Sequence, residues 1–305
     1  MFLDAIHFKD AANGLVVGDP ISNHIFLLST VDKGENWNEV PSSYFKTPLE
    51  KGQFIHLQGA DAPAGSVLVK KRTKIGPVEI AIAATVGKAH IEVESKPHVH
   101  IFSTGDEIVG LHETPKDHQI RSSNVMMLKS VLLSKGFKAN SSHLPDSAEK
   151  IKANIDKVLE SNDIILLSGG VSAGKKDLIP VVLAEAGFET VFHKITQKPG
   201  KPMLVATRSD GKVVFAFPGN PISTLTCFWV YFLPWVSGEW VEYNVKEIKF
   251  LPKPSAELDQ WIPVENGEVL AHNGSGDLIN WSRADGLVWQ KAGDKAKKLP
   301  YIPLK

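Results

Sequence analysis

Two short apolar runs in the middle of the chain each end abruptly in a glycine-containing turn. The run Ile164–Leu167 leads into the sequence SGGVSAG, and the run Val213–Phe217 leads into PGNP. A continuous apolar run of this length is typical of a strand that is buried on both faces of a parallel sheet. A helical pattern follows each turn, so each segment predicts a strand, a tight turn and a helix N-terminus.

The region from residue 98 to residue 240 repeats this alternation of strands and helices. Apolar residues recur at helical spacing over Ser123–Lys135. A helix is also predicted from Asp146 to Glu160, where Asp146 and Glu149 have the spacing of a capping box. The remaining elements are strands near His98–Phe102, Lys138–His143 and Thr190–Lys194, a helix over Leu178–Ala186, and a helix capped near Ser223. We therefore expect an α/β fold with a mostly parallel sheet and helices on both faces.

The flanking regions follow other patterns. Residues 46–97 predict a small mixed segment, with a strand at Ser66–Val69 and a helix from about Ile75 that has Pro77 in its first turn. Residues 241–305 contain short strands and turns, which suit a small β domain. Residues 1–45 are a separate β-rich segment. The sequence thus predicts four domains, at 1–45, 46–97, 98–240 and 241–305.

The composition of the 305-residue chain is ordinary for a soluble protein, with 43% hydrophobic and 22% charged residues. Basic and acidic residues balance at 34 each, so no overall field favours nucleic acid. The single cysteine, Cys227, excludes an internal disulfide framework, and its apolar helical setting indicates a core residue. The most apolar helix is too short to span a bilayer, and the first residues lack a signal-peptide pattern. We therefore expect a cytoplasmic protein with no membrane or nucleic-acid partner.

The glycine turn after Leu167 is a candidate site for a phosphate-bearing ligand. Gly169 and Gly170 let the backbone approach a ligand closely, and the free N–H groups of a helix start attract anions. Ligands of open α/β sheets bind outside the carboxyl ends of the strands. A Gly-Gly turn is equally compatible with a tight connection that binds nothing, so this turn alone leaves both interpretations open.

A lysine-rich loop strengthens the ligand interpretation. Lys194, Lys198 and Lys201 lie within eight residues of one another, in a loop that also contains two prolines and a glycine. A lone lysine cluster is normally a solvated surface feature. Mobile surface lysines do not need a backbone stiffened by proline, and the stiffening favours a site for a polyanion.

Four motifs, in this order and spacing, resemble a known enzyme family. They are STGDE at 103–107, SGGVSAGKKD at 168–177, KxxxKPGKP at 194–202 and PGNPxS at 218–223. Together they resemble the molybdopterin molybdenumtransferases, the family of MoeA and of the E domain of gephyrin, over about residues 46–305. The adenylyltransferase (MogA-like) and CinA-like families share the fold and the glycine turn, but not the KPGKP and PGNP pair.

This resemblance implies an activity and a set of ligands. A family member transfers molybdenum from molybdate to the dithiolene of adenylylated molybdopterin with Mg²⁺, and releases AMP. The resemblance also implies a MoaB/MogA-like molybdopterin-binding domain, small-molecule substrates and a homodimer. Other molybdenum-cofactor biosynthesis proteins are further candidate partners.

The resemblance also assigns roles to residues at the matching positions. The catalytic residues are Lys194, Lys198, Asp177 and Glu107, and the Mg²⁺ ligands are Glu107, Asp177 and Asp106. Asp106 is equally well explained as a turn residue. For PGNP a plain strand-to-helix turn is the less favoured alternative. The ligand pocket would be lined by Thr104, Gly105, Ser123, Asn124, Ser168, Gly169, Gly170, Ser172, Lys201, Pro218, Gly219 and Asn220.

The chain departs from the family pattern in three places. Residues 30–37, TVDKGENW, fit an Asp-box turn, and residues 1–42 resemble a single blade of a BNR-type β-propeller. They stand where the family has its N-terminal half with a functional aspartate, so we expect a truncated member. Ser122 replaces a common aspartate, and Lys175 and Lys176 stand at acidic or neutral positions. A non-catalytic molybdopterin-binding or assembly protein and a MogA-like adenylyltransferase therefore remain as alternative hypotheses.

Overall fold

The computed structural model of the chain describes residues 3–8, 10, 12–21, 24–41, 57–171, 177–239 and 243–304. The chain divides into two compact units, Met1–Val93 and Glu94–Lys305. None of the helices in the described part of the chain is long and apolar enough to cross a membrane.

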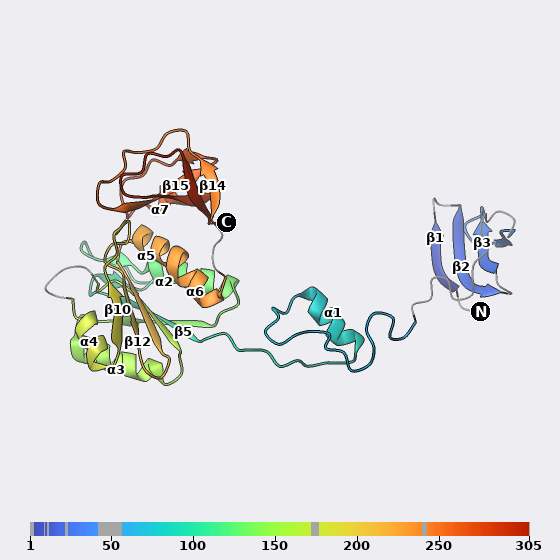
Figure 1. Ribbon diagram of the computed structural model, residues 1–305, viewed down its shortest axis with the longest axis horizontal. Coiled ribbons are helices and arrows are strands. Elements are labelled where there is room, and N and C mark those ends of the chain that lie inside the picture. Colours follow the sequence, from blue (N-terminus) through green and yellow to red (C-terminus); the bar gives the residue numbers. More distant parts are fainter. Residues whose placement is uncertain are drawn as a thin grey trace. The chain divides into compact units, whose positions relative to one another are not determined.

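The first unit begins with a four-stranded antiparallel sheet in the order β1–β2–β3–β4 (Figure 1). Its strands are β1 (Leu3–Phe8), β2 (Gly14–Ile21), β3 (His24–Thr30) and β4 (Asn38–Glu39). The predicted Asp-box turn joins β3 to β4. In it Thr30 Oγ donates to Asp32 Oδ1 at 2.6 Å, and the Asn36 N–H donates to the same oxygen at 3.0 Å. Asp32 thus closes the turn through hydrogen bonds, which is a structural role.

Residues 57–93 contain the helix α1 (Pro77–Thr85), with Pro77 in its first turn as predicted. The Gly76 N–H donates to the Glu79 carboxylate at 2.8 Å, which satisfies one of the free donors at the helix start. The strand predicted at Ser66–Val69 is wrong, because this segment pairs with no strand of the described residues. Val67 is 77% exposed there, so its β-branched side chain finds no sheet to pack on.

The second unit is built around a six-stranded sheet in the order β10–β12–β13–β9–β5–β8. The strands β8, β5, β9 and β13 run parallel, while β12 and β10 are antiparallel to their neighbours. The bounds are β5 (Val99–Thr104), β8 (Ala139–Leu144), β9 (Ile164–Ser168), β10 (Glu189–His193), β12 (Leu204–Thr207) and β13 (Val213–Phe217). The mostly parallel sheet is confirmed, and β12 is a strand that the sequence interpretation missed.

Helices cover both faces of this sheet, as the α/β pattern predicts (Figure 1). One face carries α2 (Ser123–Ser134) and a continuous helix made of α5 (Pro221–Cys227), the π-helical turn η2 (Phe228–Phe232) and α6 (Leu233–Ser237). The other face carries α3 (Ala148–Leu159) and α4 (Ile179–Glu185). Successive side chains of β5 divide between the two cores, Ile101 on the first face and Phe102 on the second.

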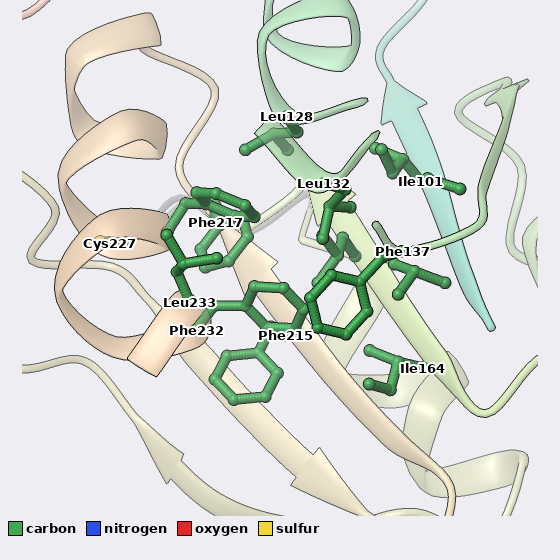
Figure 2. Packing of buried hydrophobic residues seen from close by; sticks show 14 of the residues in the cluster. Ile101, Leu128, Leu132, Phe137, Ile164, Phe215, Phe217, Cys227, Phe232 and Leu233 are labelled. Atoms are coloured by element: carbon green, nitrogen blue, oxygen red, sulfur yellow. The ribbon is translucent and has the colours of Figure 1, made fainter. Parts of the chain in front are cut away.

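The core under α2 and α5 is rich in aromatic side chains. Figure 2 shows Phe215 and Phe217 of β13 against Phe232, with Leu128 and Leu132 of α2 beside them. The rings of Phe215 and Phe232 meet edge to face at 5.1 Å between centroids. Cys227 is fully buried in the same cluster, and burial raises the pKa of its thiol above the usual range. The prediction that Cys227 is a core residue is confirmed.

Two predicted helix starts need correction. The helix α3 begins one residue later than the Asp146 capping box requires, and Ser147 is its N-cap, with Oγ accepting from the Lys150 N–H at 3.5 Å. The backbone N–H of Asp146 instead donates to Asp106 Oδ1. The helix after PGNP begins at Pro221 with Asn220 as its N-cap, rather than near Ser223.

A second sheet forms the C-terminal part of this unit, in the order β11–β15–β17–β18–β14, with β16 paired to β15. Its bounds are β11 (Gln197–Lys198), β14 (Asn244–Glu247), β15 (Asp259–Glu265), β16 (Glu268–Val269), β17 (Gly286–Gln290) and β18 (Lys298–Pro303). The short helix α7 (Leu278–Trp281) lies beside α5. The short strands β6 (Ile108–Val109) and β7 (Ile120–Arg121) pair in parallel between β5 and α2 in the sequence.

Candidate functional site

The candidate site lies where three parallel neighbours of the sheet end. In the sheet register Ser103 of β5 and Phe217 of β13 both stand opposite Ser168 of β9. The loops that follow these strands therefore start side by side. This is the carboxyl edge, at which open α/β sheets bind their ligands.

The glycine turn after β9 packs directly against the end of β5. Gly169 has φ +104°, and its N–H donates to the Phe217 carbonyl at 3.0 Å. A Cβ on Gly169 would lie 2.5 Å from Thr104 Oγ1 and 3.2 Å from the Thr104 carbonyl oxygen. Gly170 has φ +71°, and a Cβ there would meet the side chain of Ile179 at 2.8 Å. Both positions thus require glycine for backbone conformation and for space.

Asn124, in the first turn of α2, joins two of the loops. Its Nδ2 lies 2.8 Å from both Ser168 Oγ and the Gly219 carbonyl oxygen, and 3.3 Å from Thr224 Oγ1. Its Oδ1 is buried and accepts no hydrogen bond from any of the described residues. An orphaned acceptor of this kind is costly unless a ligand or water satisfies it. Ser123 begins the same helix.

The PGNP turn is fixed from two sides. Thr224 Oγ donates to the Pro218 carbonyl at 2.6 Å, and Asn220 Nδ2 donates to Ser275 Oγ at 2.9 Å. Sequence reasoning assigned no role to Thr224 or Ser275. The sequence does carry a signal for Thr224, because it follows Asn220 by four residues, which is one helical turn. Ser275 comes from the C-terminal part of the chain, and no local pattern predicts that contact.

The two acidic residues after β5 have different surroundings. The Glu107 carboxylate curls back over Gly105, where a Cβ would come within 2.5 Å of it, and Gly105 has φ +112°. Asp106 Oδ1 accepts from the Asp146 N–H at 3.2 Å, which fits the alternative of a turn residue.

Asp177 is the acidic residue with the most perturbed surroundings in the site. Burial raises its pKa to about 6, although the positive charge of Lys194 acts in the opposite direction. Its Oδ2 is buried and has no hydrogen-bond partner among the described residues. The carboxylate is thus partly dehydrated and lies within the field of a lysine, an arrangement found at functional sites. Ser172, Lys175 and Lys176 lie outside the described residues.

The lysine loop places its charges at the surface. Lys194, Lys198 and Lys201 are all exposed, and none forms an ion pair with a described residue. Lys194 has φ +73°, and its N–H donates to the Met203 carbonyl at 2.8 Å. The Ile195 N–H donates to the Lys201 carbonyl at 2.9 Å, which closes the loop. The loop therefore presents three lysines that have no ion-pair partner among the described residues.

The described residues contain no group of three or more His, Cys, Asp or Glu able to hold a metal ion. The orphaned oxygen of Asp177 still fits a single hard-cation contact. The described residues thus provide too few ligands by themselves, and oxygens of a bound ligand or of water would complete the coordination of a Mg²⁺ ion.

Comparison with known proteins identifies relatives of this chain. Residues 100–238 match a family model described as a probable molybdopterin binding domain. A molybdopterin molybdenumtransferase from Synechocystis is 35% identical over 246 residues, which are 78% of this chain and 63% of the relative. The one from Synechococcus elongatus is 37% identical over 182 residues, or 58% of this chain and 45% of the relative.

A solved structure agrees with these relatives. The molybdopterin biosynthesis MoeA protein from Pyrococcus horikoshii superimposes with a TM-score of 0.67 at 29% identity, over 81% of this chain and 64% of its own. The predicted resemblance and the predicted α/β fold are thereby confirmed. The chain spans about 45–63% of the length of the two curated relatives described above.

Proposed function

We propose that this chain, whose residues 100–238 belong to the molybdopterin-binding domain family, acts in molybdenum cofactor biosynthesis. The reaction is the insertion of molybdenum from molybdate into adenylylated molybdopterin, with release of AMP. The observation that supports it best is the junction at Asn124, which ties the glycine turn to the PGNP turn and leaves an acceptor free for a ligand. The relatives that carry the name molybdopterin molybdenumtransferase support the same reaction.

In this proposal each group of site residues has a role that follows from its chemistry. The glycine turn brings backbone N–H groups close to the phosphates, and Asn124 Oδ1 accepts from a donor of the pterin. Thr104, Ser168 and Gly219 form the wall around this contact. Lys194, Lys198 and Lys201 neutralise negative charge as the molybdate dianion approaches the phosphorylated ligand.

The proposal includes Mg²⁺, held by Asp177 and Glu107 together with ligand oxygens. Its chemistry would be to neutralise the phosphates near the released AMP. The orphaned oxygen of Asp177 supports this role, whereas the bond from the Asp146 N–H occupies one oxygen of Asp106. The proposal also includes a homodimer, supported by the exposed Val78 and Ile80 on α1. A cytoplasmic location stays a prediction from the sequence.

The test is an anaerobic assay of the purified chain with adenylylated molybdopterin, Mg²⁺ and molybdate. We expect molybdate-dependent AMP release with formation of the molybdenum cofactor. The variant Lys194→Gln should lower the rate by at least about tenfold, because one charge-assisted contact to the anions is lost. The matched control is Lys157→Gln, an exposed lysine in the last turn of α3, which should keep the wild-type rate.

A non-catalytic binding protein is the second candidate function. Ser122 favours it, because this neutral side chain forms no cap hydrogen bond at the start of α2 and supplies no metal-binding charge. Binding of adenylylated molybdopterin without AMP release would establish this function. AMP transfer from ATP onto free molybdopterin would instead support the adenylyltransferase alternative.

A further inference from the structure

Gln197 lies in the middle of the lysine loop and points away from the solvent that surrounds its neighbours. It is only 3% exposed, whereas Thr196 and Lys198 on either side are exposed. Glutamine is rarely this buried unless its amide is fully hydrogen-bonded. The sequence pattern of the loop, three lysines with two prolines, gave no indication of a buried polar residue.

The amide of Gln197 is satisfied by three different parts of the second unit. Oε1 accepts a short hydrogen bond from the hydroxyl of Tyr231 in η2 and one of 3.1 Å from Trp261 Nε1 in β15. Nε2 donates to the Pro199 carbonyl at 2.8 Å, within the lysine loop itself. One side chain thus links the helix of the α/β sheet, the C-terminal sheet and the loop that carries the lysines.

The partners of Gln197 fix which way the amide faces. Trp261 Nε1 is only a donor, and burial raises the pKa of Tyr231 above its usual range, so its hydroxyl keeps its proton. Both donors need Oε1, and the Pro199 carbonyl needs Nε2. Trp261 is in turn held by Trp289, stacked at 5.8 Å with an interplanar angle of 15°. Trp289 Nε1 donates to Asp259 at 3.0 Å.

The backbone of the loop is divided between two sheets. Lys194 is bonded to Met203 ahead of β12, on the side of the α/β sheet. Gln197 and Lys198 form β11 and pair in parallel with Asp259 and Gln260 of β15 in the C-terminal sheet. The position of the Lys198 charge relative to Lys194 therefore depends on how the C-terminal sheet is held, and the Gln197 side chain makes one of the contacts that hold it.

We propose that Gln197 is a positioning residue that sets the place of Lys198 in the ligand site by tying the lysine loop to Tyr231 and to Trp261 of the C-terminal sheet. This inference rests on the proposed function, because it requires that Lys198 contact an anionic ligand. The C-terminal sheet thereby takes part in binding, because its strand β15 pairs with the backbone of the lysine loop at β11. Neither Gln197, Tyr231 nor Trp261 needs to touch the ligand.

The test is a double-mutant cycle on the full chain with Gln197→Met, Lys198→Gln and the double variant. Methionine keeps the length and volume of glutamine but cannot form these hydrogen bonds. The dissociation constant for adenylylated molybdopterin is measured by calorimetry without molybdate, and thermal unfolding checks that each variant is folded. We expect each single variant to bind about tenfold more weakly. The double variant should bind no more weakly than Lys198→Gln alone, because Gln197 acts through that lysine.

Two further variants keep the proposal falsifiable. Tyr231→Phe removes one hydroxyl with little change of shape, and a weaker affinity that disappears in the Lys198→Gln background would support the proposal again. Gln290→Met is the matched control, a buried glutamine of the C-terminal sheet whose amide bonds to Asp294 and Gln260 outside the lysine loop. It should leave the affinity unchanged.

The possible results separate this inference from the proposed function. Additive losses in the cycle, or a Gln197→Met variant that binds like wild type, overturn the positioning role and leave the proposed function intact. An affinity loss in Gln290→Met as large as in Gln197→Met also overturns it, since any buried glutamine of the sheet would then have the same effect. A wild-type chain that does not bind the ligand overturns both.

Discussion

At the scale of single residues, the turn at the carboxyl edge of the sheet requires glycine at positions where a side chain has no room. We predict that Gly169→Ala lowers the free energy of unfolding by about 1–3 kcal/mol, from positive φ and the contact with Thr104. Gly219→Ala is the matched control. Its Cβ would lie 3.7 Å from the Gly169 Cα and its φ is not positive, so the change should stay within about 0.5 kcal/mol. Urea denaturation measures both, and equal midpoints for wild type and Gly169→Ala would contradict the close packing.

The Asp-box turn gives a prediction about pH. The pKa of Asp32 falls to about 2, chiefly because Thr30 Oγ donates to it, with further bonds from Asn36. A carboxyl whose folded pKa is depressed stabilises the fold above its unfolded pKa, and this contribution is lost as the pH falls toward 2. Carbon NMR of labelled aspartate should find Asp32 titrating near 2, and Thr30→Val should move its pKa back toward 3.8. A wild-type Asp32 that titrates near 4 would mean the turn is not closed by these bonds.

The residues of the site were only partly accessible to sequence reasoning. Asn124 and the glycine turn could be predicted, because motifs on either side of them occur in a recognisable order. Thr224 was missed although the bonds that it donates to Pro218 and Asn220 are local, whereas Gln197 was missed because its donors come from other segments. The Oε1 of Gln197 meets Trp261, which is 64 residues away, and no periodic pattern carries that information.

At the scale of elements, the sequence predicted strands correctly where burial determines the pattern of apolar residues. The strands β9 and β13 are continuous apolar runs because parallel central strands are buried on both faces. The pattern of apolar residues did not predict strands correctly where a strand depends on hydrogen bonds to a partner strand rather than on its own sequence. Gln197–Lys198 is a two-residue strand made by its contact with β15, and Ser66–Val69 has strand-like residues but no partner.

The sequence predicts Asp146 as the N-cap of α3, whereas the structure has Ser147 in that position. We predict that Ser147→Ala lowers the free energy of unfolding by about 0.5–2 kcal/mol, because the Ser147 Oγ caps the Lys150 N–H. Asp146→Ala should cost less, since the bond at this position uses the backbone N–H of residue 146, which alanine retains. Chemical denaturation of the two variants measures the difference. A larger loss for Asp146→Ala would restore the capping box predicted from the sequence.

At the scale of the whole molecule, the two units differ in how their residues are buried. The second unit contains the aromatic and aliphatic cores on both faces of its sheet, and also the C-terminal sheet that holds the lysine loop. In the first unit, none of the residues from 57 to 93 is buried, and every residue of α1 is at least partly exposed. The hydrophobic clusters of the described residues and the candidate site thus lie in Glu94–Lys305.

This difference predicts where a protease cuts first within the described part of the chain. Segments without buried side chains open locally at little cost, and Lys70, Lys71, Arg72 and Lys88 offer trypsin several sites there. We expect early cleavage in residues 70–88 and a product that keeps the thermal transition of the intact chain. Mass spectrometry identifies the cut, and sedimentation gives the oligomeric state in the same buffer. If the chain is a dimer and residues 70–88 resist trypsin, a second copy that covers α1 would account for the resistance, because no residue of α1 is buried by the described residues of its own unit. A monomer that resists cleavage there would contradict the exposure of this segment.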